Sequence, residues 1–135
     1  MTRQAPEAPT GLSQDVEPPA ADLAPYVDYW RRRQARERIR NQRLAQQARA
    51  DAVRIAAMLR RDFGVTRVVL FGSLRRGRFL PGSDIDLAVA GLAPRLFFRA
   101  LAQAGTLSEF PVDLKPLEDL DPHFRDRVLA TGEEI

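Results

Sequence analysis

The sequence predicts an α+β fold, with a small mixed sheet of three to four strands that is covered by helices on one face and preceded by a long helix. Two observations support this prediction. After residue 64, short apolar runs of strand length alternate with helix-forming segments, which is the pattern of a small sheet with packed helices. Between Pro25 and Phe63 the chain contains neither proline nor glycine and is rich in good helix formers.

The N-terminal part divides into a tail and the long helix. Residues 1–24 contain four prolines among alanine and acidic residues without periodicity, so we expect a disordered tail. Pro25 suits the first turn of a helix, and we expect one long arginine-rich helix over residues 25–63. Its last part carries an apolar face, whereas the large apolar residues of its first part are too irregularly spaced for a heptad seam. Gly64 ends the helix.

Residues 64–135 are expected to form the folded domain. The predicted elements, in order, are strand 67–71, a helical turn from Ser73, strand 84–90, helix 94–104, strand 111–117, helix 122–130 and an edge strand within 133–135. Asp121 and Pro122 make a suitable cap and first turn for the last helix. Phe97, Phe98 and Leu101 are predicted to face the core from the helix before it.

Composition limits the classes of protein that fit. The chain has 135 residues and no cysteine, so neither a disulfide framework nor a thiolate metal site is available. No apolar run approaches the length of a membrane span, and the N-terminus lacks the apolar core of a signal peptide. We therefore expect a soluble cytoplasmic protein without a membrane partner. His123, the only histidine, is expected to face solvent.

Charge is concentrated in one segment. Residues 31–61 hold eleven arginines against two acidic residues, a net charge of +9, while the whole chain carries +3. Such a segment attracts polyanions or an acidic protein surface. Docking onto a partner protein is favoured over a merely solvated helix. Nucleic-acid binding through Arg31–Arg61 is the less favoured alternative, because the stacking groups, Trp30 among them, cluster at one end.

The chemistry is predicted by a Gly-Ser pair and three acidic residues. Gly72 and Ser73 directly follow an apolar run, and ten residues later come Asp84 and Asp86. Successive side chains of a strand alternate between faces, so both carboxylates should project to one side of the sheet. Asp113 lies in a second short apolar run with the same alternation. Three carboxylates are therefore expected to gather on one face.

Clustered carboxylates repel each other unless a cation compensates them. Mg²⁺ takes oxygen ligands and is commonly held by carboxylates together with substrate phosphates. A Gly-Ser pair at a helix start offers backbone N–H groups to those phosphates. The residues therefore indicate metal-assisted phosphoryl or nucleotidyl transfer, whereas any one of them alone would be read as an ordinary turn or cap.

This pattern resembles the signature of the minimal nucleotidyltransferases (MNT proteins) of the DNA polymerase β-like superfamily, over about three fifths of the chain. The chain departs from the family pattern at Leu74, where an arginine is common, and in the length and basic charge of the segment before Val53. The matching residues are Gly72-Ser73, Arg76-Gly77, Ser83, Asp84-Ile85-Asp86 and Val112-Asp113-Leu114.

The resemblance implies a palm-like core and transfer of AMP from ATP to a hydroxyl group. It implies that Asp84, Asp86 and Asp113 are the catalytic residues and hold two Mg²⁺ ions. The nucleotide is then expected to contact the Gly-Ser pair, Arg76 and Ser83. Of these groups, Arg76 is the side chain expected to neutralise charge on the departing pyrophosphate.

The resemblance also implies a partner. MNT proteins commonly pair with HEPN-domain ribonucleases as toxin–antitoxin modules, in which the MNT protein silences the toxin by adding AMP to a tyrosine. Two alternatives remain open at this point. The protein could neutralise its partner by binding alone, or it could transfer a nucleotide to a small molecule or an RNA end.

Overall fold

The computed structural model describes residues 20–135, so most of the predicted tail of residues 1–24 lies outside the described residues. Helix α1 runs over Ala20–Phe63, beginning five residues before Pro25, and Gly64 follows it with a φ of 69°. The chain divides into two compact units, Met1–Arg38 and Ile39–Ile135. The two units are described separately.

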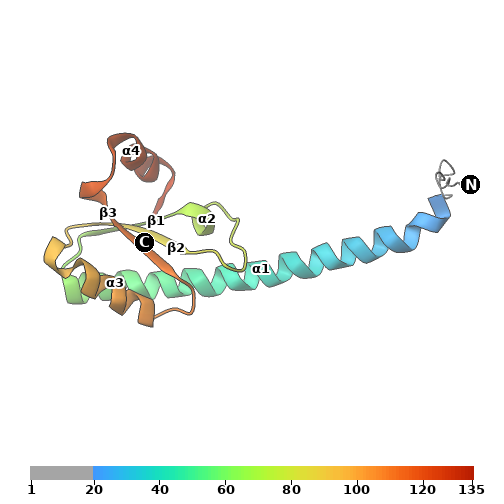
Figure 1. Ribbon diagram of the computed structural model, residues 1–135, viewed down its shortest axis with the longest axis horizontal. Helices are drawn as coiled ribbons and strands as arrows, with labels where there is room; N and C mark the ends of the chain where they lie inside the picture. Colours follow the sequence, from blue (N-terminus) through green and yellow to red (C-terminus); the bar gives the residue numbers. More distant parts are fainter. Residues whose placement is uncertain (1–19) are drawn as a thin grey trace, which may run out of the picture. The chain divides into compact units, whose positions relative to one another are not determined.

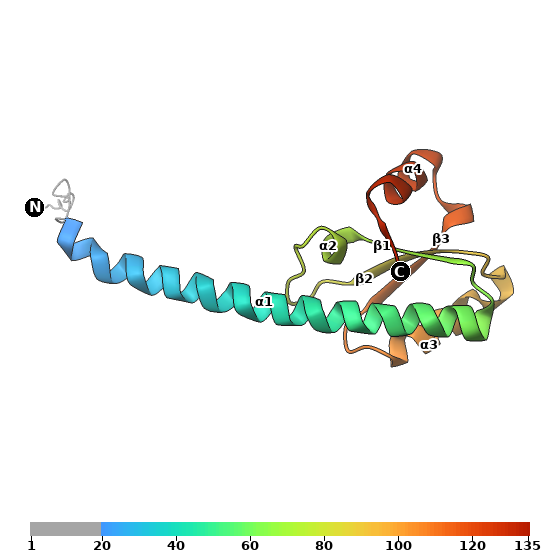
Figure 2. The ribbon, with the colours of Figure 1, turned by 180° about the vertical axis from the view of Figure 1, so that it is seen from behind.

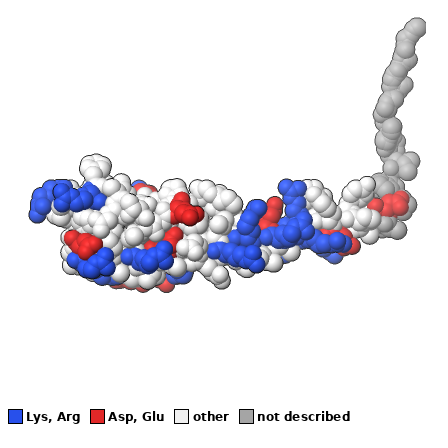
Figure 3. Space-filling view, turned by 90° about the horizontal axis from the view of Figure 1, so that it is seen from below, with Lys and Arg blue, Asp and Glu red and all other residues white. Residues whose placement is uncertain are grey.

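The described part of the first unit is the N-terminal stretch of α1. It presents an exposed apolar stripe formed by Leu23, Tyr26, Val27 and Trp30. The stripe follows the spacing i, i+3, i+4, i+7 of one helix face. Leu23 and Val27, the two aliphatic residues of this stripe, were not among the apolar residues considered in the sequence. Arginine side chains gather on the surface of the same stretch (Figure 3).

The second unit contains a four-stranded mixed sheet, as predicted. The strand order is β3-β2-β1-β4, in which β2 and β3 are parallel and the other pairs are antiparallel. The elements after α1 are β1 (Arg67–Phe71), α2 (Gly72–Arg75), β2 (Ile85–Ala90), the 3₁₀ turn η1 (Pro94–Leu96), α3 (Phe97–Thr106), β3 (Val112–Pro116), the 3₁₀ turn η2 (Leu117–Asp119), α4 (Pro122–Thr131) and β4 (Glu133–Glu134).

The main core lies between the sheet and two helices. Helix α3 and the C-terminal part of α1 cover the same face of the sheet (Figures 1 and 2). Alternate residues of β2, namely Ile85, Leu87 and Val89, are fully buried in this core. They pack against residues such as Ile55 and Leu59 of α1. Because strand side chains alternate, this packing turns Asp86 to the opposite face.

Helix α4 lies on that opposite face (Figures 1 and 2), which the sequence had left uncovered. It buries Val128 against Val69 and Ala88, and its Phe124 ring meets Phe71 edge to face at 5.9 Å. The helix begins as predicted, because Asp121 accepts hydrogen bonds from the first free N–H groups of the helix. The site face is therefore bounded on one side by α4.

One predicted core residue was placed wrongly. Phe97 and Leu101 pack against the core, but Phe98 is 80% exposed, beside an apolar hollow of about 420 Å³. Phe98 lies 100° around the helix from Phe97 and falls outside the arc of α3 that faces the core, which is formed by Phe97, Ala100, Leu101 and Ala104. His123 is exposed, as expected. No helix within residues 20–135 is both long enough and apolar enough to cross a membrane.

Candidate functional site

The register of the sheet brings two of the predicted acids side by side. Asp86 of β2 pairs directly with Asp113 of the parallel strand β3. Neighbouring strands lie about 4.8 Å apart, and residues in register project to the same face. Both side chains are half-buried on the face that α4 partly covers. Two carboxylates therefore stand next to each other at the start of the parallel pair.

Asp84, the third acid, acts on Asp86 through its charge. It immediately precedes β2 and is exposed, so solvent screens part of its charge. Burial, and after it the charges of Asp113 and Asp84, raise the pKa of Asp86 to about 6. Lys115 and Arg76 act in the opposite sense, because positive charge favours the ionised carboxylate. The folded chain thus holds clustered negative charge that it compensates only in part.

Gly72 is required by the position of Asp86. A Cβ atom at residue 72 would lie 2.0 Å from Asp86 Oδ2, and Gly72 adopts a φ of 76°. Only glycine combines that backbone conformation with so close an approach. The glycine therefore makes room for the acid itself. This role differs from the phosphate contact that the sequence suggested, and the two are compatible.

The other predicted nucleotide-binding residues lie in or directly after α2 and in the loop before Asp84. Ser73 follows Gly72 in the short helix α2 and is half-exposed, while Arg76 is exposed at the end of α2. Ser83 is engaged within its own loop, where its hydroxyl accepts a hydrogen bond from Leu80 N at 3.0 Å. The hydroxyl proton of Ser83 remains free to be donated. Gly72, Ser73 and Arg76 thus lie in the segment after β1, which approaches the acids at Asp86.

A lysine lies among the acids, which the sequence analysis did not anticipate. Lys115 Nζ is 3.1 Å from Asp113 Oδ2. Within residues 20–135, no three His, Cys, Asp or Glu side chains stand in an arrangement ready to hold a metal ion. The carboxylates are adjacent, but one of them is already paired. Alternation along β3 was the available signal, since Lys115 lies two residues after Asp113.

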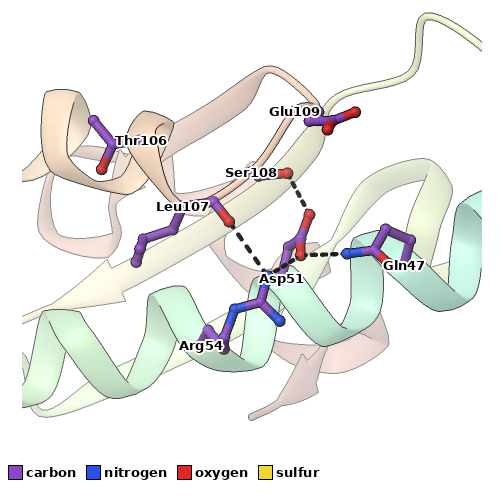
Figure 4. Close-up of a pocket in the computed structure, with 7 residues that line it drawn as sticks. All are labelled: Gln47, Asp51, Arg54, Thr106, Leu107, Ser108 and Glu109. Atoms are coloured by element: carbon purple, nitrogen blue, oxygen red, sulfur yellow. Dashed lines mark hydrogen bonds and ion pairs between the residues drawn. The ribbon is translucent and has the colours of Figure 1, made fainter.

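A second polar cluster lies on the opposite side of the sheet and supports the strand that carries Asp113. Asp51 of α1 is almost fully buried; Gln47 Nε2 donates to it at 2.9 Å and Ser108 Oγ at 2.7 Å, and Arg54 pairs with it. Ser108 in turn accepts a hydrogen bond from Phe110 N. These groups line a cavity of about 480 Å³ (Figure 4).

The hydrogen bonds of Asp51 are made within the protein, so the cluster anchors the turn before β3 to α1. The sequence analysis had counted Asp51 only as a charge. Its position beside the apolar residues Ala48, Ala52 and Ile55 on one face of the helix was the signal that it faces the core.

Comparison with known proteins identifies the family. A family model described as a nucleotidyltransferase domain matches residues 53–132, more than half of the chain. The chain belongs to this nucleotidyltransferase domain family. The matched range contains every residue of the candidate site. No curated protein sequence matches this nucleotidyltransferase.

Solved structures agree with this assignment. A candidate minimal nucleotidyltransferase is 28% identical, with a TM-score of 0.59 over 67% of this chain and 95% of that one. A toxin–antitoxin crystal structure with AMP-PNP is 24% identical, with a TM-score of 0.55 over 62% of this chain and 70% of that one.

A third structure contains a tri-AMPylated Shewanella oneidensis HEPN toxin in complex with an MNT antitoxin. It is 21% identical, with a TM-score of 0.51 over 64% of this chain and 70% of that one. At such identities the last two structures establish the fold alone. The resemblance to minimal nucleotidyltransferases that the sequence indicated is therefore confirmed, and the chain is assigned as a nucleotidyltransferase.

Proposed function

We propose that this nucleotidyltransferase is an antitoxin that moves AMP from ATP to a hydroxyl group, that of a tyrosine, on a partner HEPN ribonuclease toxin in the cytoplasm. One observation carries the proposal. Asp86 and Asp113 are paired in register, and their mutual repulsion, together with that of Asp84, helps raise the pKa of Asp86 to about 6. Such a cluster is unfavourable by itself and suits a site that binds cations.

The residues present fit Mg²⁺. Asp84, Asp86 and Asp113 supply only carboxylate oxygens, the donors that Mg²⁺ prefers. A positive group, the Lys115 ammonium, already lies against one of these carboxylates, so the position favours a cation. Two such ions, held by these carboxylates, would stabilise charge on the entering and leaving oxygens of an in-line displacement.

The loop after β1 is proposed to bind the triphosphate. The backbone N–H groups of Gly72 and Ser73 and the Ser73 hydroxyl donate to the outer phosphates. Arg76 neutralises charge that develops on the departing pyrophosphate. Ser83 holds the loop before Asp84 and offers its hydroxyl proton to the nucleotide.

The proposed transfer forms one P–O bond and breaks another. The acceptor oxygen forms a bond to the α-phosphorus of ATP, and the bond from that phosphorus to the bridging oxygen breaks. Pyrophosphate leaves with the bonding electrons, and the acceptor hydroxyl releases its proton to solvent. Asp113 is proposed to help activate this hydroxyl, since it lies beside Asp86 in the register of the two strands.

Two solved structures support the proposed partner and substrate. One relative is crystallised with the ATP analogue AMP-PNP, and in another complex the HEPN toxin carries AMP groups. The exposed apolar stripe of α1, which the arginines from Arg31 onward follow along the helix, is proposed as the docking surface for the toxin. Aliphatic side chains such as Leu23 and Val27 fit an apolar groove and do not stack on bases, which favours a protein over RNA.

The test of the proposal is the mass of the partner. We would co-express the chain with the product of the neighbouring reading frame, which we expect to be a HEPN protein, and measure the intact mass of that partner. We expect adducts of whole AMP units with the wild-type chain and none with the Asp84→Asn/Asp86→Asn double variant. Adducts of equal yield with the double variant would refute the proposed chemistry.

The docking surface has its own test. Removal of residues 1–38 cuts at the boundary between the two units and leaves every core residue in place. We expect the truncated protein to bind ATP normally and to modify the partner much more slowly. If the truncated protein modified the partner at the wild-type rate, the N-terminal stretch of α1 would have no role in docking the partner. A steep salt-dependent affinity of the full chain for RNA would favour the nucleic-acid alternative.

A second function, neutralisation by binding alone, is favoured by one observation. Asp113 is paired with Lys115, and the described residues 20–135 hold no arrangement ready for a metal. In this case the double variant would still protect cells against the toxin while the toxin's mass stayed unchanged. Transfer to a small molecule or an RNA end would instead give labelled product from purified chain without any protein partner.

A further inference from the structure

Lys115 is the only lysine in the chain, which otherwise uses arginine for its basic residues. It lies on β3 two residues after Asp113, so both side chains project to the site face. Its Nζ is 3.1 Å from Asp113 Oδ2, and its side chain is 38% exposed. Its neighbour in register on β2 is Ala88, which is too small to block it. The ammonium therefore stands directly among the acids.

The charges around Lys115 are unbalanced. The acids of the cluster are Asp84 and Asp86 at the start of β2 and Asp113 on β3, and the positive groups that act on Asp86 are Lys115 and Arg76. Arg76 is exposed and forms none of the described ion pairs. An arginine offers a rigid planar fork, whereas a lysine offers a compact point charge on a flexible stem. A lysine can thus withdraw from a carboxylate without moving the strand.

We propose that Lys115 is a built-in counter-cation: its ammonium holds Asp113 while no metal is bound and leaves that carboxylate when a divalent ion binds. The inference rests on the proposed metal site and adds a residue that the family signature does not contain. Lys115 is a positioning residue here, because it acts through Asp113. The ion pair with Lys115 explains why Asp86 and Asp113 are adjacent although no three metal-ligating side chains in residues 20–135 are arranged to hold an ion.

The proposal predicts two effects of opposite sign for Lys115→Gln. Without metal, the variant should be less stable than wild type, because the repulsion between the acids is no longer relieved. Its affinity for Mn²⁺ in the absence of nucleotide should rise roughly three- to tenfold, because a competing positive charge has been removed. Lys115→Arg should retain wild-type affinity or weaken it. A purely structural ion pair would lower stability and leave the metal affinity unchanged.

The first experiment is a Mn²⁺ titration followed by electron paramagnetic resonance. The charge-matched control is Arg99→Gln on α3, which covers the other face of the sheet, and it should bind like wild type. Asp86→Asn tests the metal site itself and should bind much more weakly. Equal Mn²⁺ affinity of Lys115→Gln and wild type would refute the counter-cation role of Lys115 and leave the proposed metal site in place. Lack of binding in every variant would overturn both.

The second experiment needs no variant. Because there is only one lysine, selective labelling with ¹³C,¹⁵N-lysine gives a single lysine side-chain signal in the nuclear magnetic resonance spectrum. We expect Mg²⁺ to move this signal toward the position of free lysine as the ammonium leaves Asp113. The same titration of Asp86→Asn should leave the signal in place. A signal that stays unmoved while Mg²⁺ saturates the wild-type site would refute the proposal.

Discussion

Replacing Asp86 by asparagine should stabilise the metal-free protein above pH 7. Burial and the charges of Asp113 and Asp84 raise the pKa of Asp86 from its ordinary 3.8 to about 6. The folded chain therefore binds this proton more tightly than the unfolded chain does. The free energy of unfolding then decreases as pH rises from about 4 to about 6 and stays lower above that range. Asparagine has no charge to bury, so the variant lacks this decrease.

The magnitude follows from the same values. A pKa raised from 3.8 to about 6 corresponds to at most about 3 kcal/mol, at about 1.4 kcal/mol for each tenfold change in proton affinity. Because the carboxylate is only half-buried, solvent screening reduces this figure to about 1–2 kcal/mol. For a domain of this size, that is a rise of roughly 5–10 °C in Tm at pH 8. Near pH 4 the two proteins should unfold at nearly the same temperature.

The assay is thermal unfolding by circular dichroism between pH 4 and pH 8, with a chelator present. The control is Asp126→Asn, which removes an exposed acid of α4 and should leave the pH dependence unchanged. A variant that is less stable than wild type at pH 8 would show that the Asp86 carboxylate is stabilising. The reasoning on repulsion within the cluster would then be wrong.

Three further predictions concern the residues around the site. Gly72→Ala should lower the free energy of unfolding by about 2–4 kcal/mol, measured by urea unfolding, because its Cβ would overlap the carboxylate that it contacts. Asp51→Ala should cost about 1–3 kcal/mol in the same assay, because it removes the buried carboxylate that accepts part-buried hydrogen bonds from Gln47 and Ser108. Ser73→Ala and Arg76→Ala should each weaken binding of a non-hydrolysable ATP analogue with Mg²⁺ by calorimetry, while the fold keeps its stability.

The chain offers matched controls for these variants. Gly77 has a φ of 75° with open space around it, so Gly77→Ala isolates the backbone cost of about 1 kcal/mol. Equal losses for both glycine variants would refute the contact with Asp86. Asp51→Asn should lose less than the alanine variant, and equal losses would contradict the role of the hydrogen bonds. Arg78→Ala, a nearby exposed arginine, should leave nucleotide affinity unchanged, and unchanged affinity for Ser73→Ala and Arg76→Ala would remove the phosphate assignment.

Local patterns were sufficient to predict the elements of the fold. The alternation of Ile85, Leu87 and Val89 with polar or small residues predicted both the strand and the face that the core covers. The cap at Asp121 and the break at Gly64 were readable because their chemistry is local. The position of α4 on the opposite face was not readable, because its apolar residues fit either side of a sheet.

Contacts between distant segments could not be read from the sequence. The pairing of Asp86 with Asp113 depends on the register of two strands, and no short-range signal sets the register of a parallel pair. The approach of Gly72 to Asp86 depends on the same long-range packing. The part of Lys115 in the site was missed for a different reason: a lysine is not a metal ligand, although alternation along β3 places it on the same face as Asp113.

The central claim is that the acids of β2 and β3 transfer the AMP portion of ATP to the partner. The most direct measurement compares transfer of label to the partner from ATP labelled at the α-phosphate and at the γ-phosphate. We expect the partner to gain α-label and no γ-label with the wild-type chain, and neither label with Asp86→Asn. Transfer of γ-label, or undiminished transfer of α-label by Asp86→Asn, would contradict the proposed mechanism.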